Sequence, residues 1–474
     1  MAYFWIIFEF QVRQIIRNRL AVVCMSLFLL FGFYSMYSGY AVIERQRTVI
    51  DSIQAGYQTK FNRVSAKFHP KDTTASAKRD SSYAAMPVMI NYWLPQNVVS
   101  PPSAIAFLSP GQRDIYPYYT TVRSTSDYLD ASDSEIRNPL KQFFGNLDLA
   151  FVIIYLLPLL GVGISFNILS EEKDAGTYRL LVCAGLSEHR LVVYKLLCRI
   201  LFLAILLSLL FLTAAIAGPD GASRTSLMFL QALLYLLFWA GFFYFTLRMR
   251  LGGNQTALVQ LFCWAFILII LPPMISSLIS ASYPVPLKTG IASYQRHIGE
   301  EVWNTDKKIL VNTFLKNNPR YRKYYKADWD TTQWSGWPIA GYYDLKERKV
   351  SNYAKNYNLP VLKRKALSGR LMIFNPALLI QTAFNITAGT SAESYEAFKT
   401  EMQAFQKKWQ YFIYSYELPD KSMTPESLRK FPKFRLKEQP AITGSSVRAL
   451  AALFVWTAFL VLLGLVAGRI PTGN

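Results

Sequence analysis

A short charged stretch with the sequence ILSEEKDAGTYRLL (residues 168–181) lies between two long apolar runs. It contains the adjacent carboxylates Glu171 and Glu172, followed by Asp174, Tyr178 and Arg179. These groups can form ion pairs and hydrogen bonds with another protein, and the apolar residues beside them can be buried in the contact. The stretch is therefore predicted to bind a partner rather than to catalyse a reaction.

Motifs of catalysis and of metal binding are missing from the chain. No G-x-x-x-x-G-K-[ST] loop is present to hold a nucleotide phosphate, and no G-x-S-x-G elbow is present to hold a serine nucleophile. The three histidines and four cysteines have no spacing that is typical of a metal site. We therefore predict that the protein is not an enzyme and has no metal or cofactor of its own.

Six apolar runs of about twenty residues dominate the composition, which is 52% hydrophobic and 15% aromatic. At about 1.5 Å per residue, a helix of that length crosses the ~30 Å hydrocarbon core of a membrane. The first run follows Arg13, Arg17 and Arg19 and could be a signal peptide. Its length exceeds the usual ~7–15 residues of a signal-peptide core, so it is predicted to be an uncleaved span.

The predicted fold is an all-α polytopic membrane protein with a mainly helical domain outside the membrane. An interfacial helix is expected at residues 1–19, and an amphipathic helix at residues 170–190 joins spans 2 and 3. Two long hydrophilic inserts cover residues 44–146 and 280–446. The six predicted spans are residues 20–43, 147–169, 191–217, 227–247, 257–279 and 447–468.

Basic residues in the short loops indicate the orientation of the spans. Three arginines precede the first span, and further basic residues on the same side lie at 170–195, at 248–256 and at Arg469. The opposite short loop, residues 218–226, holds only Arg224. Both termini are therefore predicted to be cytoplasmic, and both inserts to lie outside.

The net charge of +21 is concentrated in the second insert, where residues 280–446 hold 26 basic and 14 acidic residues. Because this insert is expected outside, nucleic acid is not predicted as a partner. Anionic lipid head groups, envelope polymers or an acidic protein are better candidates. The alternative is a solvated surface without a dedicated ligand.

Acidic residues are nearly absent from the apolar runs. Asp148 lies at the edge of the second run, and Arg199 in the third is expected to reach the interface with its long side chain. A carrier driven by protons or ions usually places acids or histidines inside the membrane. Such a carrier is therefore disfavoured, and energy for transport must come from another subunit.

Local patterns predict that most of the second insert is helical. Apolar residues at three- and four-residue spacing favour helices at 291–315 and 345–372. Pro376, after an asparagine, is predicted to begin another helix, and Ser391 to cap the one that follows. The aromatic stretch at residues 321–343 suits packing over a domain core, with stacking on a ligand as the alternative.

The first insert is predicted to begin with a helix and to continue with loops. Apolar residues from Val42 to Phe61 extend the helix of the first span. Residues 71–82 are polar and are expected to form a loop, and residues 101–117 are rich in turn residues. None of the cysteines lies in either insert, so no disulfide can staple them.

The link between spans 2 and 3 is predicted to contain one short helix. Asp174 is expected to cap its first turn and Gly185 to follow its last turn, with Ser187 capping the third span. One face of the helix would present its anchoring residues and the other its charges. The predicted anchors are Tyr178, Leu181 and Val182, with Glu171, Glu172 and Arg179 at the rim. Such a helix can act as a lever for a partner, or it can simply anchor the loop at the interface.

The same stretch resembles a known family. EEKDAGTYRLL, followed by Ser187, Arg190 and Lys195, is similar to the link between spans 2 and 3 of ABC-2-type permeases, the membrane subunits of type V ABC exporters. Its most recognisable residues in this chain are Glu171, Glu172, Gly176 and Thr177. The N-terminal FEFQVRQIIRNRL also resembles the family's interfacial helix, with Glu9, Arg13 and Arg17 at the matching positions.

Further motifs resemble the subgroup of these permeases that has two large extracytoplasmic inserts and a domain of unknown function. NPLKQFFGNLDLAFVIIYLLPLL is similar to its entry into span 2, with Asn138, Pro139 and Asp148. LSPGQRDIYPYY is similar to its first-insert motif, with Gln112 and Asp114. YPVP and NPALLIQTAFNITAGT look like parts of its second insert. Together these motifs extend the resemblance over most of the chain.

The resemblance implies a permease subunit in a bacterial cytoplasmic membrane. It implies a second permease, identical or a paralogue, and a dimer of ABC ATPase subunits that bind ATP and Mg²⁺ in place of this chain. The link would be the coupling helix that docks into the ATPase. The expected cargo is a lipid, peptide or other envelope substrate moved outward. The main alternative is a subunit that relays ATPase strokes to the inserts and so regulates an envelope protein.

Overall fold

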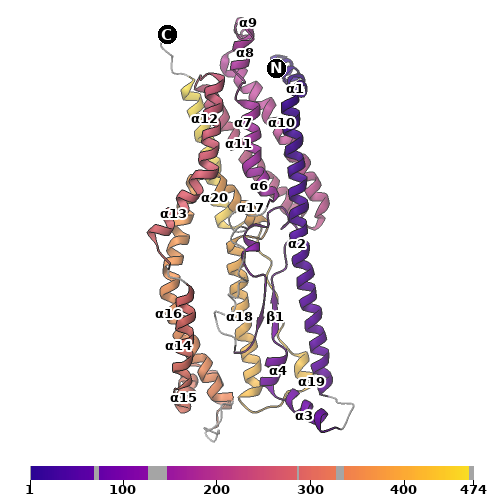
Figure 1. Ribbon diagram of the computed structural model, residues 1–474, viewed down its shortest axis with the longest axis vertical. Coiled ribbons are helices and arrows are strands. Elements are labelled where there is room, and N and C mark those ends of the chain that lie inside the picture. The colour runs from indigo at the N-terminus through magenta and orange to yellow at the C-terminus, as the bar shows by residue number, and fades with distance from the viewer. Residues whose placement is uncertain (1, 69–73, 126–146, 286–287, 327–335, 469–474) are drawn as a thin grey trace.

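The computed structural model describes residues 2–68, 74–125, 147–285, 288–326 and 336–468, and shows a helical bundle continued by an elongated outer part (Figure 1). The two ends of the bundle differ. One end carries α1, α8 and α9, and we call it the α9 end. The other end leads into the outer part, and we call it the insert end. Both chain termini lie at the α9 end (Figure 1).

Six helical spans in the described residues are long and apolar enough to cross a membrane. They overlap the six apolar runs of the sequence, and the chain is mainly helical, as predicted. The helices of the bundle are α1 (Ala2–Arg17), α2 (Arg19–Lys67, through its first half), α6 (Leu149–Phe151), α7 (Leu157–Ser165), α8 (Ser170–Asp174), α9 (Thr177–Cys183), α10 (Glu188–Ala217), α11 (Ala222–Arg248), α12 (Gly253–Ala265), α13 (Leu271–Ser282) and α20 (Gly444–Ala467).

Spans 2 and 5 share a local distortion. Each contains a single π-helical turn, Val152–Leu156 in span 2 and Phe266–Ile270 in span 5. A proline follows each turn within two residues, Pro158 in α7 and Pro272 in α13. Proline has no N–H to donate, so the helix loses a bond there and its register widens. Two of the six spans therefore have a built-in weak point, which lies near the insert end of span 2 and near the middle of span 5.

The helix of span 1 continues far into the first insert, as predicted. α2 is one unbroken helix of 49 residues, which corresponds to about 74 Å at 1.5 Å per residue. Its first half lies in the bundle, and its second half forms one edge of the outer part (Figure 1). Asn18 separates it from α1 by accepting a hydrogen bond from the backbone of Ala21 at 3.2 Å.

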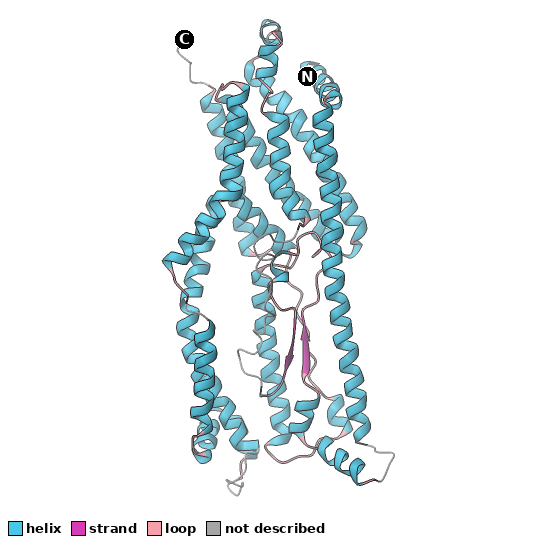
Figure 2. Ribbon diagram, in the orientation of Figure 1, coloured by secondary structure: helices cyan, strands magenta, loops and turns pink. Residues whose placement is uncertain are grey.

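The outer part is helical around an aromatic core, with one small β-ribbon (Figure 2). Strands β1 (Gln96–Val99) and β2 (Tyr119–Val122) pair antiparallel, an exception to the predicted all-α fold. The core buries Tyr321 and Trp337 of the aromatic stretch. Trp329 and Trp334 of that stretch lie outside the described residues. The helices of the outer part are α3 (Ala75–Ala84), α4 (Pro87–Trp93), α14 (Lys288–Trp303), α15 (Lys307–Asn317), α16 (Gly336–Leu371), α18 (Ala392–Glu417) and α19 (Pro425–Arg429).

Part of the second insert returns into the bundle. After α16 the chain turns through a short 3-10 helix, and α17 (Pro376–Thr387) runs back between α11 and α20. The helical arms on either side of this turn, Asn358–Phe374 and Pro376–Glu417, form an angle of 119°. At the turn, Trp456 of span 6 donates to the backbone oxygen of Ile373 at 2.8 Å, and Asn375 donates to that of Ile267 in span 5 at 2.9 Å. We call residues 366–387 the re-entrant segment.

Several local predictions are confirmed and two are wrong. Pro376 begins α17 and Ser391 caps α18, as predicted, and Asn375 supplies the cap of α17. Residues 71–82 are not all loop, because Thr74 caps the helix α3. The helix expected over residues 291–315 is broken, because Asp306 accepts two backbone hydrogen bonds and caps α15 as a new helix. Polar capping residues explain both differences, since they end or begin a helix where apolar spacing alone would continue it.

Candidate functional site

The link between spans 2 and 3 projects from the α9 end of the bundle (Figure 1). It contains two short helices, α8 and α9, rather than one. The predicted cap at Asp174 is wrong, because Asp174 ends α8 and α9 begins at Thr177. Gly176, with a φ of +73°, forms the elbow between them, a backbone conformation that favours glycine.

The far end of α9 follows the predicted pattern. Gly185 has a φ of +84° and donates to the backbone oxygen of Val182 at 3.0 Å, and Leu186 donates to that of Leu181 at 3.1 Å. This pair of bonds is the Schellman arrangement that ends helices. Ser187 then accepts a hydrogen bond from the backbone of Arg190 and caps α10, as predicted.

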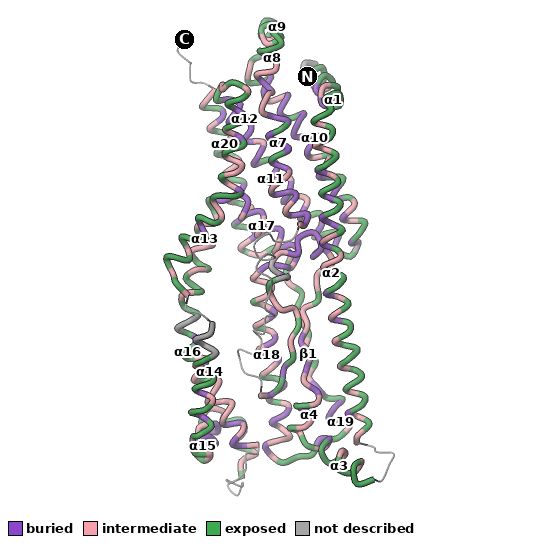
Figure 3. Tube along the Cα trace, in the orientation of Figure 1, coloured by how far each residue is buried: buried purple, intermediate pink, exposed green. Residues whose placement is uncertain are grey.

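The surface of α9 is largely uncovered. None of its residues is buried (Figure 3). Leu180 is 70% exposed and Val182 is 45% exposed, whereas Leu181 and Tyr178 are partly covered by the spans. Arg179 is exposed, as is Asp174 on α8. The helix therefore presents Leu180 and Val182 as its apolar surface, and Leu180 is a candidate contact residue that the sequence prediction missed.

Glu172 lies inside the protein rather than at a rim. Its carboxylate accepts hydrogen bonds from the Lys195 ammonium group and from the Thr177 hydroxyl. The side chains of Glu172 and Lys195 are only 10% and 2% exposed. A buried ion pair of this kind fixes the position of both partners, because separating them would leave a charge without compensation. It joins α8 and the start of α9 to α10.

Glu171 belongs to a second, adjacent network around Arg199. Arg199 is buried and donates to the backbone oxygen of Ile164, to Asn167 at 2.9 Å and to Gln11 at 3.3 Å. Its guanidinium also pairs with Glu171 at 3.5 Å. These acceptors hold the Arg199 side chain at the α9 end of the bundle, and its predicted reach to the membrane interface stays a prediction. The acceptors include the end of span 2 and the helix α1.

The helix α1 is fastened to this network by its glutamines. Gln14 donates to Glu171, and Gln11 donates to Gln14 at 2.7 Å. Glu9 and Arg13, two of the residues that carry the resemblance, form an exposed ion pair at 2.5 Å one turn away. Arg17, the third such residue, is exposed at the end of α1. The glutamine face of α1 thus contacts the link.

A third contact ties α9 to the ends of spans 3 and 4. The Tyr178 hydroxyl donates to Glu188 at 3.0 Å, and Glu188 pairs with Arg248 at 3.2 Å and with Arg250 at 3.5 Å. Partial burial raises the pKa of Tyr178, and its hydrogen bond to the Glu188 carboxylate raises the pKa further. Tyr178 therefore remains a neutral donor at physiological pH.

The motif residues of the inserts meet at the insert end of the bundle. Ser109 donates to Asn385 at 2.7 Å, and Thr390 donates to the backbone oxygen of Ser109 at 2.7 Å. The rings of Tyr116 and Tyr395 stack with their centroids 4.2 Å apart. We call these five residues the insert joint. It connects the motifs LSPGQRDIYPYY and NPALLIQTAFNITAGT, which are far apart in the sequence.

The other predicted insert residues lie at different places in the structure. Asp148 caps the start of span 2 by accepting a hydrogen bond from the backbone of Phe151 at 2.7 Å. Gln112 and Asp114 lie in a short 3-10 helix, Gly111–Asp114, beside the insert joint. Asn138 and Pro139 lie outside the described residues. Asp148 and the helix Gly111–Asp114 lie at the insert end, away from the site at α9.

Metal binding has no support within the described part of the chain. No group of three or more histidine, cysteine, aspartate or glutamate side chains there could hold a metal ion. The four cysteines are free. The candidate site at α9 is thus an exposed short helix whose base is held by three polar networks.

Comparison with known protein families gives one match. Residues 289–437 match the family described as Domain of unknown function (DUF3526). The comparison with curated proteins and the comparison with solved structures each give no match. The matched residues contain the helices α15 to α19 and most of α14, whereas α9 and its networks lie outside them.

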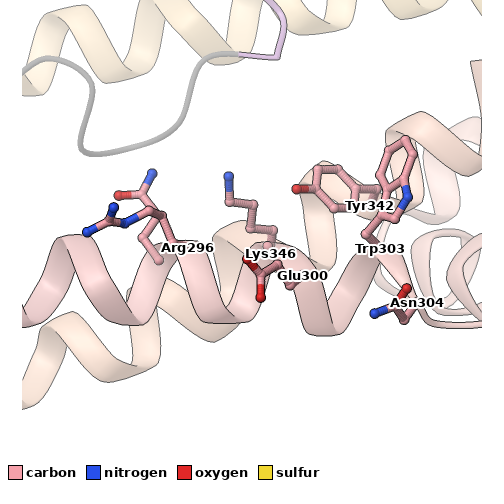
Figure 4. A pocket seen from close by; sticks show the side chains of 8 residues that line it. Arg296, Glu300, Trp303, Asn304, Tyr342 and Lys346 are labelled. Atoms are coloured by element: carbon pink, nitrogen blue, oxygen red, sulfur yellow. The ribbon is translucent and has the colours of Figure 1, made fainter.

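The matched residues include a surface recess of about 680 Å³ between α14 and α16 (Figure 4). The rings of Trp303 and Tyr342 meet edge to face in its wall, with centroids 5.6 Å apart. Arg296, Glu300 and Lys346 line it as well, so both signs of charge are present. This mixture favours no single class of ligand, and we assign the recess no function.

Proposed function

We propose that this chain is the transmembrane permease subunit of an ATP-driven exporter, with ATP hydrolysis in a separate subunit. One feature carries this proposal: α9 is an uncovered apolar helix whose base is held by buried ion pairs. Because α9 is only seven residues long, it gains little stability by itself. Its exposed Leu180 and Val182 are suited to a partner's groove.

The three networks give α9 defined connections to the bundle. Glu172 with Lys195 connects it to span 3, and Glu171 with Arg199 connects its base to spans 2 and 3. Tyr178 connects it to Glu188 and so to the end of span 4. A partner that moved α9 would therefore move several spans together, since packed helices move as rigid bodies. The π turns in spans 2 and 5 are places where such a motion could bend a span.

In this proposal the α9 end is cytoplasmic and the outer part lies outside a bacterial cytoplasmic membrane. A dimer of ABC ATPases binds ATP and Mg²⁺ and grips α9. A second permease completes the transmembrane pathway, and the cargo is a lipid, peptide or other envelope substrate. The resemblance of residues 168–181 to ABC-2-type permeases supports these assignments, together with the exposure of α9.

Photo-crosslinking in cells tests the proposal. The photoreactive residue p-benzoylphenylalanine would replace Leu180 on α9 or, as a control, Leu197, which is 53% exposed on α10. Crosslinking from position 180, but not from 197, is expected to capture a protein with a nucleotide-binding loop. Capture from position 180 of a protein without such a loop, or of a protein that is not on the cytoplasmic side, would overturn the proposal.

Substitution at the same surface provides the activity test. In the purified complex, Leu180→Asp together with Val182→Asp is expected to lower ATP hydrolysis by at least about tenfold, because two carboxylates would be buried at the contact. Both side chains are exposed, so the unfolding temperature of the isolated chain should not change. Unchanged ATP hydrolysis in this variant would contradict the role of α9.

A second candidate function is mechanical transmission to an envelope protein. The observation that favours it is α2, one continuous helix from the α9 end of the bundle to the far end of the outer part. Crosslinking from Tyr92, which is 66% exposed on α4, distinguishes the two functions. Transmission predicts that position 92 captures an envelope protein only while ATP is being hydrolysed. Capture that does not depend on ATP hydrolysis would count against transmission.

A further inference from the structure

The C-terminal half of α16, with the turn that follows it, is basic and largely uncovered. Residues 358–374 hold four basic residues and no acidic residue. Lys363, Lys365 and Arg370 are exposed. Several large apolar side chains are exposed on the same segment: Leu359, Val361, Leu362, Ile373 and Phe374. Cations combined with exposed apolar residues on one helix are typical of elements at a membrane surface.

Two contacts place the basic residues level with the end of span 5. Arg364 donates to the backbone oxygen of Tyr283 at 2.6 Å and to that of Ser280 at 3.4 Å. The Lys363 ammonium lies 5.9 Å from the centre of the Tyr283 ring. The helix of span 5 ends at Ser282. The head groups of the leaflet at the insert end are therefore at the level of these side chains.

Contacts near the start of span 6 independently place the basic residues at the same level. Its helix begins at Gly444, and Ser445 donates to Glu393 of α18 at 2.6 Å. Glu396, one turn further along α18, pairs with Lys365 at 2.5 Å. Lys365 thus lies about one helical turn beyond the end of the span, where a membrane has its head groups.

The apolar residues of the segment lie deeper. Trp456 donates to the backbone oxygen of Ile373 at 2.8 Å. Trp456 is twelve residues inside α20, or about 18 Å along the helix at 1.5 Å per residue. Ile373 and Phe374 are therefore at the depth of acyl chains, and they are 46% and 61% exposed. A soluble acidic polymer or protein could not reach them.

We infer that residues 358–374 bind anionic phospholipid in the leaflet at the insert end. Lys363, Lys365 and Arg370 contact the phosphate-bearing head groups, and Ile373 and Phe374 contact the acyl chains. Glu396 offsets part of the charge of Lys365, so the other two cations contribute most. This inference does not depend on ATP-driven export, because it rests only on the depth and charge of the segment.

Spin-labelled lipids measure this preference in the full-length protein. The chain would be reconstituted in phosphatidylcholine vesicles with a trace of spin-labelled phosphatidylglycerol or phosphatidylcholine, and the fraction of immobilised lipid measured by electron paramagnetic resonance. The test variant is K363Q/K365Q/R370Q, which keeps Arg364 because that residue bonds backbone oxygens. The control is K407Q/K408Q/K421Q, which removes three exposed cations from the distant part of α18 and the loop after it.

The preference for phosphatidylglycerol over phosphatidylcholine is expected to fall at least about fivefold in the test variant, since one well-placed basic residue alone has about this effect. The control should keep the preference of the parent. An equal preference in the parent and the test variant, or an equal loss in the control, would overturn the inference. The preference is a ratio between two lipids measured on the same variant. A partly unfolded fraction therefore does not produce the expected change in this ratio.

A photoreactive residue at Leu362 gives a second readout. Position 362 is 60% exposed and carries no charge. Irradiation in native membranes is expected to attach phospholipid, detected as a mass increase on the peptide that contains residue 362. Attachment of a protein instead of lipid would show that this surface is an interface with another polypeptide and would overturn the inference.

Discussion

The two ends of the bundle are held together by different chemistry. At the α9 end, buried charges connect the elements, as in Glu172 with Lys195 and Glu171 with Arg199. At the insert joint, the connections are neutral: Ser109 bonds to Asn385, and two tyrosine rings stack. The α9 end should therefore depend on individual partners, whereas the insert joint should depend on close packing.

The difference follows from the cost of separating the partners. Removal of one partner from a buried ion pair costs about 3–5 kcal/mol, because the other charge stays buried. Loss of a neutral hydrogen bond costs only about 1 kcal/mol. The α9 end thus has few arrangements that satisfy its charges. Such an end suits the transfer of a displacement, whereas the insert joint suits a permanent attachment.

The largest expected effect comes from Lys195→Met. This change leaves the Glu172 carboxylate buried beside Thr177 without its cation. The free energy of unfolding should fall by about 3–5 kcal/mol, measured as denaturant or thermal unfolding in detergent. The double variant E172Q/K195M should recover most of this loss, since it removes the buried charge itself. A double variant as unstable as K195M would contradict the ion-pair interpretation of this end.

A smaller effect is expected from two glycines of the same helix, α2. A Cβ at Gly39 would overlap the backbone oxygen of Phe107 at the insert end, whereas a Cβ at Gly56 has nothing within 4 Å. Gly39→Ala should lower the unfolding free energy by about 1–3 kcal/mol through overpacking. Gly56→Ala should raise it by up to about 1 kcal/mol, because alanine is the better helix former. Equal effects of both changes would rule out close packing as the basis of this attachment.

Helix caps and membrane spans at both ends of the bundle were predicted from the sequence. Local signals succeeded: Ser187 and Ser391 cap helices, and Pro376 begins one, where their side chains and positions indicated. The apolar runs likewise indicated the six spans, because span length is set by the membrane. These features depend on neighbouring residues or on a uniform solvent, so one sequence is enough.

Features that depend on distant contacts were missed. The burial of Glu172 requires Lys195, which a charged stretch read by itself does not reveal. Leu180 was not chosen because the register of α9 depends on the left-handed Gly176. The re-entrant segment was placed in an outside domain, since its basic residues and Pro376 conceal the apolar character of both arms. The β-ribbon has strands of only four residues, too short for an alternating pattern.

A motif in span 6 likewise did not reveal its packing partner from the sequence alone. Gly464 and Gly468 form a GxxxG that suits either dimer formation or packing within the chain. In the structure, a Cβ at Gly464 would lie 2.5 Å from the Tyr244 ring, so this face packs against α11 of the same chain. The motif indicates close approach of two helices, and only the fold identifies the second helix.

Glu417, at the far end of the outer part, is an acid that lies near another acid. Glu172 has a cation as its partner, whereas the half-buried Glu417 is influenced by Asp420. Burial, with the nearby Asp420 carboxylate, raises the pKa of Glu417 to about 7. In the unfolded chain the pKa of this carboxyl is about 4.5. The folded state therefore holds the proton more tightly than the unfolded state does.

The sign of the pH dependence follows from that difference, and its size is the smallest expected here. Between pH 4.5 and pH 7 the unfolded chain loses this proton first, so rising pH favours unfolding. Glu417 is partly exposed, so solvent screens much of this effect, and the unfolding temperature of the outer part should fall by only on the order of 2 °C from pH 5 to pH 8 through this group. Glu417→Gln should remove that part of the pH dependence and leave the unfolding temperature at pH 8 equal to or above that of the parent. If the variant instead showed the parent's full pH dependence, another group would hold the proton and the role given to Glu417 would be wrong.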